Sequence, residues 1–586
     1  MEQAKLTGYP SVDRPWLKYY DAEALRAPLP ACTVCENVWR HNRTHLSDAA
    51  LEYCGRTISY RKLFSEVDRC ARALRQNGVQ TGDQILLCMT NVPEAVYLVL
   101  AVSKIGAVAN CLNPLFPAWQ TQRLIRETGA RFLFLLDRMA PHLADAVAAC
   151  AVTTVLIPAA GSLGFPRRLA SRCGTQASAF AQRTGKPCLC YESKFLRAGH
   201  AFCGTTEAAY APCRPVITVY SSGTTGDAKG IQLTNDGVNA LIHEFTVSGM
   251  PFHRPLRSLD VGPIWLSTGV VFNLLLPLCT GMVSILEPSI FDVNAFCADV
   301  AKRRPTHMIA TPSLWLAAAE HPLWKTLDLS FLRLPMAGGE ALPPAQEDAV
   351  NAFFAARGFR DGITKGYGMC ELGSAATAAS LHFNKRGSVG IPLPHVLISA
   401  FDPETDAELP FGQRGELRVA TPCRMLGYYQ DPAATEAFFF RAADGRLWGR
   451  TGDVGYLDED GNVFVLGRVN DSFVAQNGLR CYFFDTETVI RQDSAVSACK
   501  VVAIDAADGP LPVAHLILHA DCADPAGAVR RIAASCADSL PAHAVPKGFK
   551  LRKKFPMRTS TGKRDIEALK AERDGFADAN NRPLRV

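Results

Sequence analysis

Short apolar runs alternate along most of the chain with longer segments in which apolar and polar residues recur at helical spacing. Four of the short runs have the length and composition of buried strands: residues 84–90, 131–136, 153–158 and 282–288. Residues 60–78 and 93–110 between them have a helical pattern. Because strands that alternate with helices form parallel βαβ units covered on both faces, the predicted fold class is α/β.

The pattern changes in the last third of the chain. Beyond about residue 385 it becomes short runs such as GELRVA and GNVFVLGR, separated by Gly, Pro and Asp, which predict a β-rich subdomain. After Arg468 a final segment has strand and helix signals of its own, including ACKVVAID and PAGAVRRIAASCADSL. We therefore expect a large N-terminal domain of stacked βαβ sheets plus the β-rich subdomain (residues 1–468) and a small α+β C-terminal domain (469–586).

Two stretches depart from the regular alternation: one is uncharged, and the other is rich in Gly and Pro. Residues 261–286 carry no charge and are long enough to test as a membrane span. Internal Pro, Gly and Asn residues interrupt the stretch, so it predicts a buried helix followed by a strand. Residues 160–215 are rich in Gly and Pro with weak periodicity, which predicts partly irregular structure.

Charge and cysteine content bear on nucleic-acid binding, on the state of the thiols and on zinc binding. The chain has 62 basic and 56 acidic residues with no long block of one sign, so its charge gives no support to nucleic-acid binding. Its 20 cysteines are scattered, and without a recognisable signal peptide they predict mostly free, buried thiols in the cytoplasm. The Cys32/Cys35 and Cys188/Cys190 pairs lack a second pair that would complete a zinc site.

The basic run KGFKLRKKF (547–555) has two interpretations. It could contact a nucleotide tail or place the protein peripherally at a membrane. Phe549, Leu551 and Phe555 alternate with basic residues, which favours a half-exposed strand.

Residues 221–230, SSGTTGDAKG, have the composition of a loop that binds phosphate. Glycines let backbone N–H groups converge, hydroxyls donate hydrogen bonds, and Lys229 supplies a positive charge. The loop is not a Walker A motif, because Ala228-Lys229-Gly230 stands where Gly-Lys-Ser/Thr is required. A flexible surface linker is the alternative, and the apolar residues on both sides disfavour it.

The loop resembles the signature of the adenylate-forming superfamily, which includes acyl-CoA synthetases, adenylation domains and firefly-type luciferases. Further motifs resemble that family in the same order: AGGEAL (337–342), GYGMCE (366–371), RTGD (450–453), LGR (466–468) and PMRTSTGKRD (556–565). The resemblance covers roughly residues 50 to 570. Ala228 replaces the usual Pro before the lysine, and Cys370 replaces the usual Thr before the glutamate.

The resemblance implies a role for each motif. ATP and AMP binding falls to Ser221, Ser222, Gly223, Thr224, Thr225, Gly226, Lys229, Gly339, Glu340, Ala341, Tyr367, Gly368, Met369, Cys370, Asp453, Arg468 and Lys563. The catalytic residues are Lys563, Glu371 and Lys229. Glu371 and Thr225 are the expected Mg²⁺ ligands, because a hard cation prefers oxygen donors. Lys563 would stabilise charge at the α-phosphate, while Lys229 would hold the β- and γ-phosphates.

The acid that reacts is expected to be hydrophobic, with a medium- or long-chain fatty acid or a related acid favoured. In amino-acid-activating relatives an Asp pairs with the substrate ammonium, and Leu266 stands at that position here, where an ammonium would be unpaired. Many acyl-CoA synthetases have His there instead. The expected acyl pocket comprises Trp265, Leu266, Gly269, Gly338 and Gly366, and residues 159–169 resemble a segment of medium- and long-chain fatty acyl-CoA synthetases.

The resemblance implies that ATP and a carboxylic acid give an acyl-adenylate and pyrophosphate, after which a thiol, with CoA favoured, takes the acyl group. The C-terminal domain is expected to rotate at Asn470 between these steps. The loop after it has Val474 where a lysine is common, so an acyl carrier protein stays open as the acceptor. A non-catalytic sensor of acyl groups or nucleotides is the alternative from another class.

Overall fold

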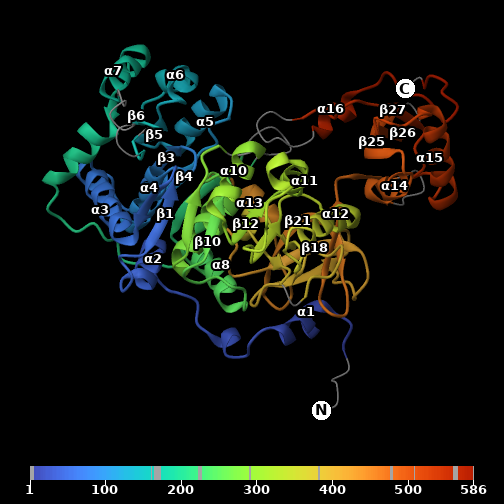
Figure 1. Cartoon of the computed structure of the whole chain (residues 1–586), viewed down its shortest axis with the longest axis horizontal. Helices are drawn as coiled ribbons and strands as arrows, with labels where there is room; N and C mark the ends of the chain where they lie inside the picture. The colour runs from blue at the N-terminus through green and yellow to red at the C-terminus, as the bar shows by residue number, and fades with distance from the viewer. Residues whose placement is uncertain are drawn as a thin grey trace.

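The predicted alternation of strands and helices is confirmed in a computed structural model, which describes residues 6–159, 161–163, 173–221, 228–289, 292–380, 383–474, 480–506, 509–557 and 565–584. Two large sheets, each with a parallel centre, form the N-terminal part of the molecule, and smaller sheets of five, two and three strands follow in the chain (Figure 1). The fold class is α/β, as the sequence predicted.

The first large sheet has eight strands and is parallel from β8 to β7. Its order across the sheet is β19 (Gly427–Tyr428), β9 (Gly230–Thr234), β8 (Pro215–Tyr220), β4 (Val108–Cys111), β3 (Gln84–Cys88), β5 (Phe132–Leu136), β6 (Thr153–Ile157) and β7 (Cys188–Cys190). β9 is antiparallel to both of its neighbours, β8 and β19. The candidate phosphate loop therefore connects two antiparallel strands.

The second large sheet has nine strands, and its parallel part runs from β14 to β1. Its order is β16 (Ile391–Pro392), β15 (Thr377–Ala378), β14 (Thr364–Tyr367), β13 (Leu334–Ala337), β12 (His307–Ala310), β10 (Arg257–Asp260), β11 (Val283–Leu286), β1 (Ala49–Tyr53) and β2 (Arg56–Ser59). Because neighbouring parallel strands end at the same edge, the loops after β13 and β14 lie together.

Helices pack around both sheets (Figure 1). They are α1 (Pro10–Asp13), α2 (Val34–Asn42), α3 (Tyr60–Gln76), α4 (Pro93–Lys104), α5 (Ala118–Thr128), α6 (Ala140–Ala148), α7 (Cys173–Thr184), α8 (Asn235–Val247), α9 (Leu276–Thr280), α10 (Val293–Arg303), α11 (Pro312–Glu320), α12 (Pro344–Ala355) and α13 (Pro432–Phe438). The side chain of Ser59 accepts the N–H of Lys62 and caps α3. The largest apolar core includes side chains from α2, α3, α4 and α8.

Two segments differ from their predicted structure. The helix expected over residues 93–110 ends at Lys104, and Val108 begins β4. Gly106 has a φ of 73°, a left-handed conformation that ends the helix and that glycine adopts without strain. Within the stretch 160–215, residues 173–201 are more ordered than expected, since they contain α7, β7 and the helical turns η4 (Tyr191–Leu196) and η5 (Gly199–Ala201).

The uncharged stretch 261–286 folds as predicted. It forms the π-helical segment η6 (Thr268–Leu275), α9 and then β11, and these residues are almost all buried in the core. Among the residues the structure describes, no helix has both the length and the apolar character needed to cross a bilayer.

A five-stranded antiparallel sheet forms the β-rich subdomain. Its strands are β17 (Leu397–Phe401), β18 (Gly415–Ala420), β20 (Phe439–Arg441), β21 (Leu447–Leu457) and β22 (Val463–Arg468). Strands β21 and β22 pair so that Asp453 lies opposite Arg468. This register brings the two expected ribose ligands together.

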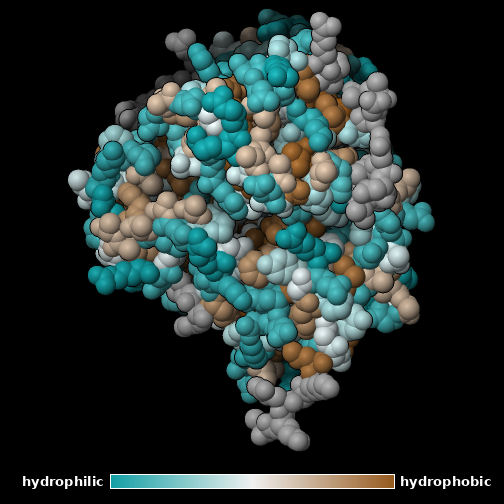
Figure 2. Space-filling view, turned by 90° about the vertical axis from the view of Figure 1, so that its right-hand side faces the viewer, coloured by the Kyte–Doolittle hydropathy of each residue, from teal (hydrophilic) through white to brown (hydrophobic). Residues whose placement is uncertain are grey.

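The last elements form an α+β unit with its own apolar cores. They are β23 (Ser472–Val474), β24 (Arg480–Tyr482), α14 (Phe483–Ile490), β25 (Val496–Ala506), β26 (Gly509–Leu518), α15 (Pro525–Ser539), β27 (Gly548–Leu551) and α16 (Ile566–Ala571). Figure 1 shows β25–β27 with α14–α16 at one end of the molecule, and apolar side chains are scattered over the face at that end (Figure 2). The boundary after Arg468 stays a prediction.

The basic run 547–555 contains strand β27, as favoured, but the strand covers only its first part. Phe549 is buried in an apolar cluster with residues of α14, α15, β25 and β26, whereas Leu551 is 48% exposed. The alternation in the sequence therefore predicted the strand correctly, but the burial that it implied for Leu551 is wrong.

A buried ion pair supports strand β14 just before the expected adenine-binding residues. The ammonium of Lys365 donates to Glu347 on α12 and to the carbonyl of Lys385, and the two charged side chains are only 4% and 3% exposed. Burial lowers the pKa of Lys365, and the Glu347 carboxylate opposes that effect.

Replacing Lys365 with methionine should lower the free energy of unfolding by about 3 kcal/mol, because it leaves the Glu347 carboxylate buried without its cation. Equilibrium urea unfolding followed by fluorescence measures this loss. The double variant Lys365→Met/Glu347→Leu should recover much of it, since no buried charge is left unpaired. A single variant as stable as the original chain would contradict the role given to the pair.

Candidate functional site

The loops after β13 and β14 bring two of the predicted motifs together. The ends of these parallel strands pair through Ala337 and Lys365, and a Cβ added to Gly338 would lie 3.8 Å from the carbonyl oxygen of Gly366. Gly339 has a φ of 81°, so the turn requires a residue that tolerates the left-handed region. Glu340 and Ala341 are exposed beyond it. This edge presents backbone groups to a flat ligand.

Three side chains form one hydrogen-bonded group at this edge. The hydroxyl of Tyr367 donates to Asp453 Oδ2 at 2.6 Å, and the guanidinium of Arg468 donates to Asp453 Oδ1 at 2.7 Å. Burial and the Asp453 carboxylate raise the pKa of Tyr367, so its hydroxyl stays protonated and remains a donor. Both oxygens of Asp453 thus accept hydrogen bonds from fixed neighbours, and a carboxylate held in this way is suited to the hydroxyls of a sugar.

The segment after Tyr367 turns sharply and buries a carboxylate. A Cβ on Gly368 would lie 2.1 Å from the carbonyl oxygen of Ser374, so only glycine fits. Met369 and Cys370 are half-buried, and Cys370 begins the short helical turn η8 (Cys370–Leu372). Burial raises the pKa of Glu371 in that turn.

Tyr428 connects Glu371 to the candidate phosphate loop. Its hydroxyl donates to Glu371 Oε1 at 2.9 Å, while the ammonium of Lys229 lies 5.1 Å from the centre of its ring. The Lys229 ammonium also lies 3.8 Å from Asp431 Oδ2. Tyr428 is on β19, which pairs with β9 directly after Lys229. One aromatic residue therefore contacts both groups that are expected to bind the triphosphate and its metal.

The ends of the candidate phosphate loop are joined. The N–H of Ser221 donates to the carbonyl of Lys229 at 3.0 Å, and the N–H of Lys229 donates to the Ser221 hydroxyl at 3.3 Å. A Walker A loop connects a strand to a helix, whereas this one connects β8 to β9, which agrees with its sequence. The predicted ligands Ser222, Gly223, Thr224, Thr225 and Gly226 lie outside the described residues.

Three of the predicted acyl-pocket residues, Trp265, Leu266 and Gly269, lie near the start of η6, whereas Gly338 follows β13 and Gly366 lies in β14. Trp265 is buried, and Leu266 is half-buried against the core. A Cβ on Gly269 would lie 2.0 Å from the carbonyl oxygen of Pro263, so glycine is required where the backbone doubles back. The Ser374 hydroxyl donates to the Thr268 hydroxyl at 3.2 Å, which joins η6 to the segment that carries Glu371.

The C-terminal residues of the prediction are only partly described. Asn470 is exposed in a turn, where the N–H of Asp471 donates to the carbonyl of Arg468 at 3.1 Å. Lys563 lies outside the described residues. The N–H of Asp565 donates to the carbonyl of Pro556 at 2.8 Å, so the residues that flank the lysine motif are joined.

Sequence reasoning missed Tyr428 and Asp431. Both lie in GYYQDP, where an aromatic residue and an acid before a proline predict only a turn and a helix start. Their contact with Lys229 depends on pairing between β9 and β19, two strands far apart in the chain. The one feature of the sequence that could have indicated a strand here was the adjacent glycine and tyrosine in the β-rich region.

Replacing Tyr428 with phenylalanine should lower kcat/KM for ATP about tenfold, because it removes a hydrogen bond to a charged, buried carboxylate. Leucine at the same position should cost a further factor of about three, since it also removes the ring beside Lys229. Steady-state ATP titrations measure both effects. Tyr429→Phe is the matched control, because the Tyr429 hydroxyl bonds to Gln430 instead. Equal losses at both tyrosines would contradict this role.

Comparison with known proteins gives a consistent result. Residues 38–429 match the model of a family described as "AMP-binding enzyme". The chain is 28% identical to 4-coumarate--CoA ligase 1 of Petroselinum crispum over 79% of its own length and 80% of the relative. It is 25% identical to the long-chain-fatty-acid--CoA ligase of Bacillus subtilis (strain 168), over 94% and 96%.

Solved structures share the same fold. The anthranilate CoA ligase bound to anthranoyl-AMP superposes with a TM-score of 0.75, covering 93% of this chain and 98% of the other at 21% identity. The similarity therefore extends through the C-terminal elements as well as the two large sheets.

Proposed function

Because this chain belongs to the AMP-binding enzyme family of the adenylate-forming superfamily, we propose that it is an acid–thiol ligase that converts a hydrophobic carboxylic acid to its CoA thioester. A carboxylate oxygen of the acid attacks the α-phosphorus of ATP. The bond from that phosphorus to the bridging oxygen breaks, and pyrophosphate leaves with the electron pair. The CoA thiolate then attacks the acyl carbon of the adenylate and releases AMP.

The observation that supports this proposal most is the meeting of two polar groups at one segment. Tyr367 belongs to the group with Asp453 and Arg468, and Glu371, four residues later, belongs to the group with Tyr428 and Lys229. A nucleotide whose ribose lies on Asp453 would extend its phosphates towards Lys229. Position and charge then supply most of the catalysis.

Mg²⁺ fits the residues at this site. Glu371 offers one buried carboxylate that Tyr428 already orients, and Mg²⁺ in nucleotide sites uses one or two carboxylates together with substrate phosphates. Within the described part of the chain no group of three His, Cys, Asp or Glu side chains could hold a metal, so the phosphates would complete its coordination. When bound, the ion would neutralise charge on the phosphates.

The acid is proposed to be apolar near its carboxylate. Trp265 and Leu266 place no charge beside the expected acyl position, which supports fatty or aromatic acids over amino acids. The relatives named for coumarate and for long-chain fatty acids represent both kinds of acid. We therefore propose a hydrophobic acid, either fatty or aromatic.

Acid-dependent exchange of labelled pyrophosphate into ATP tests the first step across a panel of aromatic and fatty acids. We expect exchange with at least one hydrophobic acid and none with free amino acids. Mass spectrometry with CoA or an acyl carrier protein then identifies the acceptor, and we expect acyl-CoA. No exchange with any acid would overturn the enzymatic proposal and favour a non-catalytic sensor.

A further inference from the structure

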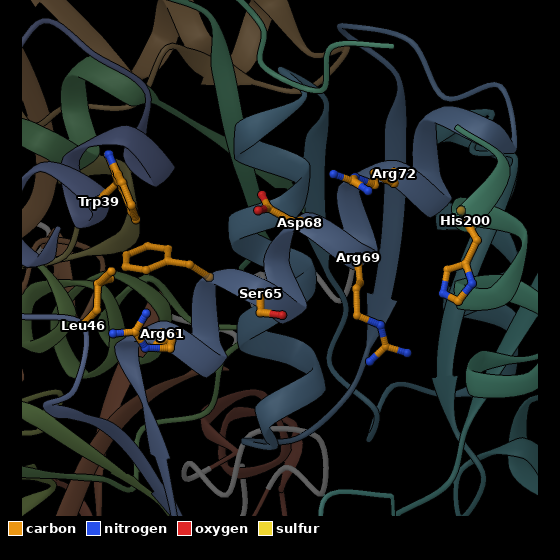
Figure 3. A pocket seen from close by; sticks show the side chains of 10 residues that line it. Trp39, Leu46, Arg61, Ser65, Asp68, Arg69, Arg72 and His200 are labelled. Carbon is orange, nitrogen blue, oxygen red and sulfur yellow. The ribbon is translucent and has the colours of Figure 1, made fainter. Parts of the chain in front are cut away.

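A cavity of about 480 Å³ lies on the surface of the N-terminal part, between α2, α3 and η5 (Figure 3). None of the described residues of the nucleotide site lines it. Its volume falls within the range of about 300–1,000 Å³ that is typical of small-molecule sites. The chemistry of its walls therefore decides whether it can bind a ligand.

One end of the cavity is apolar and aromatic. Trp39 of α2 is 41% exposed, although tryptophan is usually well buried. Its ring meets the ring of Phe64 edge-on, with centroids 4.9 Å apart, and Leu46 completes this end. A large exposed aromatic surface of this kind offers a stacking partner for the apolar body of a ligand.

The other end is basic. Figure 3 shows Arg69, Arg72 and His200 on the opposite side of the cavity from Trp39. The Arg69 guanidinium already donates to Glu66 at 2.6 Å and to Glu192 at 3.4 Å. Arg72, by contrast, has no carboxylate within 4.0 Å among the described residues. Its five donors remain available for an anion, which guanidinium groups bind in bidentate fashion.

Acidic side chains near the cavity do not cancel this charge. Asp68 lines the cavity, and the ammonium of Lys104 donates to it from α4 while also pairing with Glu207 at 3.0 Å. Glu66 is held by Lys62 and Arg69. Arg61 adds a further guanidinium beside the apolar end, and it too has no acidic partner within the described chain. The free charge of the cavity is therefore positive.

The walls of the cavity are firmly built. The opposite face of α3 is buried in the core through Leu63, Val67 and Leu74. The backbone of η5 packs directly on α3, because a Cβ on Gly199 would lie 2.7 Å from the backbone nitrogen of Ala73. A preformed site of this kind loses little entropy when a ligand binds.

We propose that this cavity binds a small amphiphilic anion, with its apolar body on Trp39 and Phe64 and its phosphate or carboxylate on Arg72. Phe64 and Arg72 are eight residues apart on α3, which corresponds to about 12 Å along the helix axis. Both side chains lean towards the N-terminus of α3, and the arginine is the longer of the two, so the Arg72 guanidinium reaches back towards Phe64. An aromatic monophosphate has the required size.

Isothermal titration of the full-length protein with 1-naphthyl phosphate tests the proposal. The titration is made with saturating ATP present and repeated with Lys229→Ala, so that binding at the nucleotide site is excluded. We expect saturable binding in both, and at least tenfold weaker binding of 1-naphthol and of inorganic phosphate. A titration with 1-naphthoate tests a carboxylate in place of the phosphate. If 1-naphthoate binds more tightly than 1-naphthol, the result supports an anion site.

Variants locate the binding. Arg72→Glu and Trp39→Ala should each weaken 1-naphthyl phosphate at least tenfold, while Arg360→Glu, an exposed arginine elsewhere, should change it less than twofold. Circular dichroism and thermal unfolding confirm that each variant is folded. Absence of saturable binding, or equal affinity in Arg72→Glu and Arg360→Glu, would overturn the proposal. Neither result depends on whether the protein ligates an acid to CoA.

Discussion

Glu371→Gln should lower the rate of pyrophosphate exchange by about 10² to 10³ at saturating ATP and Mg²⁺, the cost typical of losing one preorganised electrostatic group. The substitution preserves shape, and the amide oxygen can still accept the Tyr428 hydroxyl. It removes the charge that the metal requires, so the concentration of Mg²⁺ at half-maximal rate should also rise. Exchange assays at several Mg²⁺ concentrations measure both quantities.

Glu320→Gln is the matched control. Glu320 is an exposed glutamate at the end of α11, and it is not among the residues expected to bind nucleotide, metal or acyl group. We expect its exchange rate to stay within threefold of the unmodified protein. A Glu371→Gln variant with unchanged Mg²⁺ dependence would remove Glu371 from the metal site.

Lys563→Ala should reduce adenylation at least 10³-fold yet leave thioester formation from a supplied acyl-adenylate within about threefold. In-line attack builds negative charge at the α-phosphate, and an ammonium close to it stabilises that charge. In the second step the C-terminal domain would be rotated, and this rotation would withdraw the lysine from the site. Pyrophosphate exchange measures the first step, and release of AMP from acyl-adenylate and CoA measures the second.

Lys570→Ala provides the comparison for this variant. Lys570 lies on α16, a few residues after the lysine motif, and its ammonium pairs with Glu567 at the surface. Both half-reactions should stay within twofold. If Lys563→Ala slowed both half-reactions equally, rotation about Asn470 would be the wrong description of how the two steps share one site.

Much of the fold could be predicted because its central strands are buried on both faces. Residues 132–136 are a continuous apolar run for that reason, residues 153–157 become apolar after two threonines, and each segment forms a strand. The position of an element's end was harder to predict, also for a physical reason. Val108–Cys111 continue the apolar pattern of α4, and only the left-handed Gly106 separates helix from strand.

The candidate site could be predicted where a motif is local in the chain. The resemblance named Tyr367, Asp453 and Arg468, and the structure places the three within hydrogen-bonding distance. Tyr428 could not be found in this way. Its contacts arise from a two-residue strand, and a pairing so short and so distant in sequence leaves no periodicity to detect.

The order of strands in the nine-stranded sheet also affects how the chain is made. β1 ends at Tyr53, but its parallel partner β11 begins only at Val283. At 5–20 residues per second, a ribosome needs about 10 to 50 s to synthesise the residues between them. During that time one edge of a nascent hairpin stays open to pairing with other chains. The yield of soluble protein should therefore respond to holdase chaperones and to slower growth.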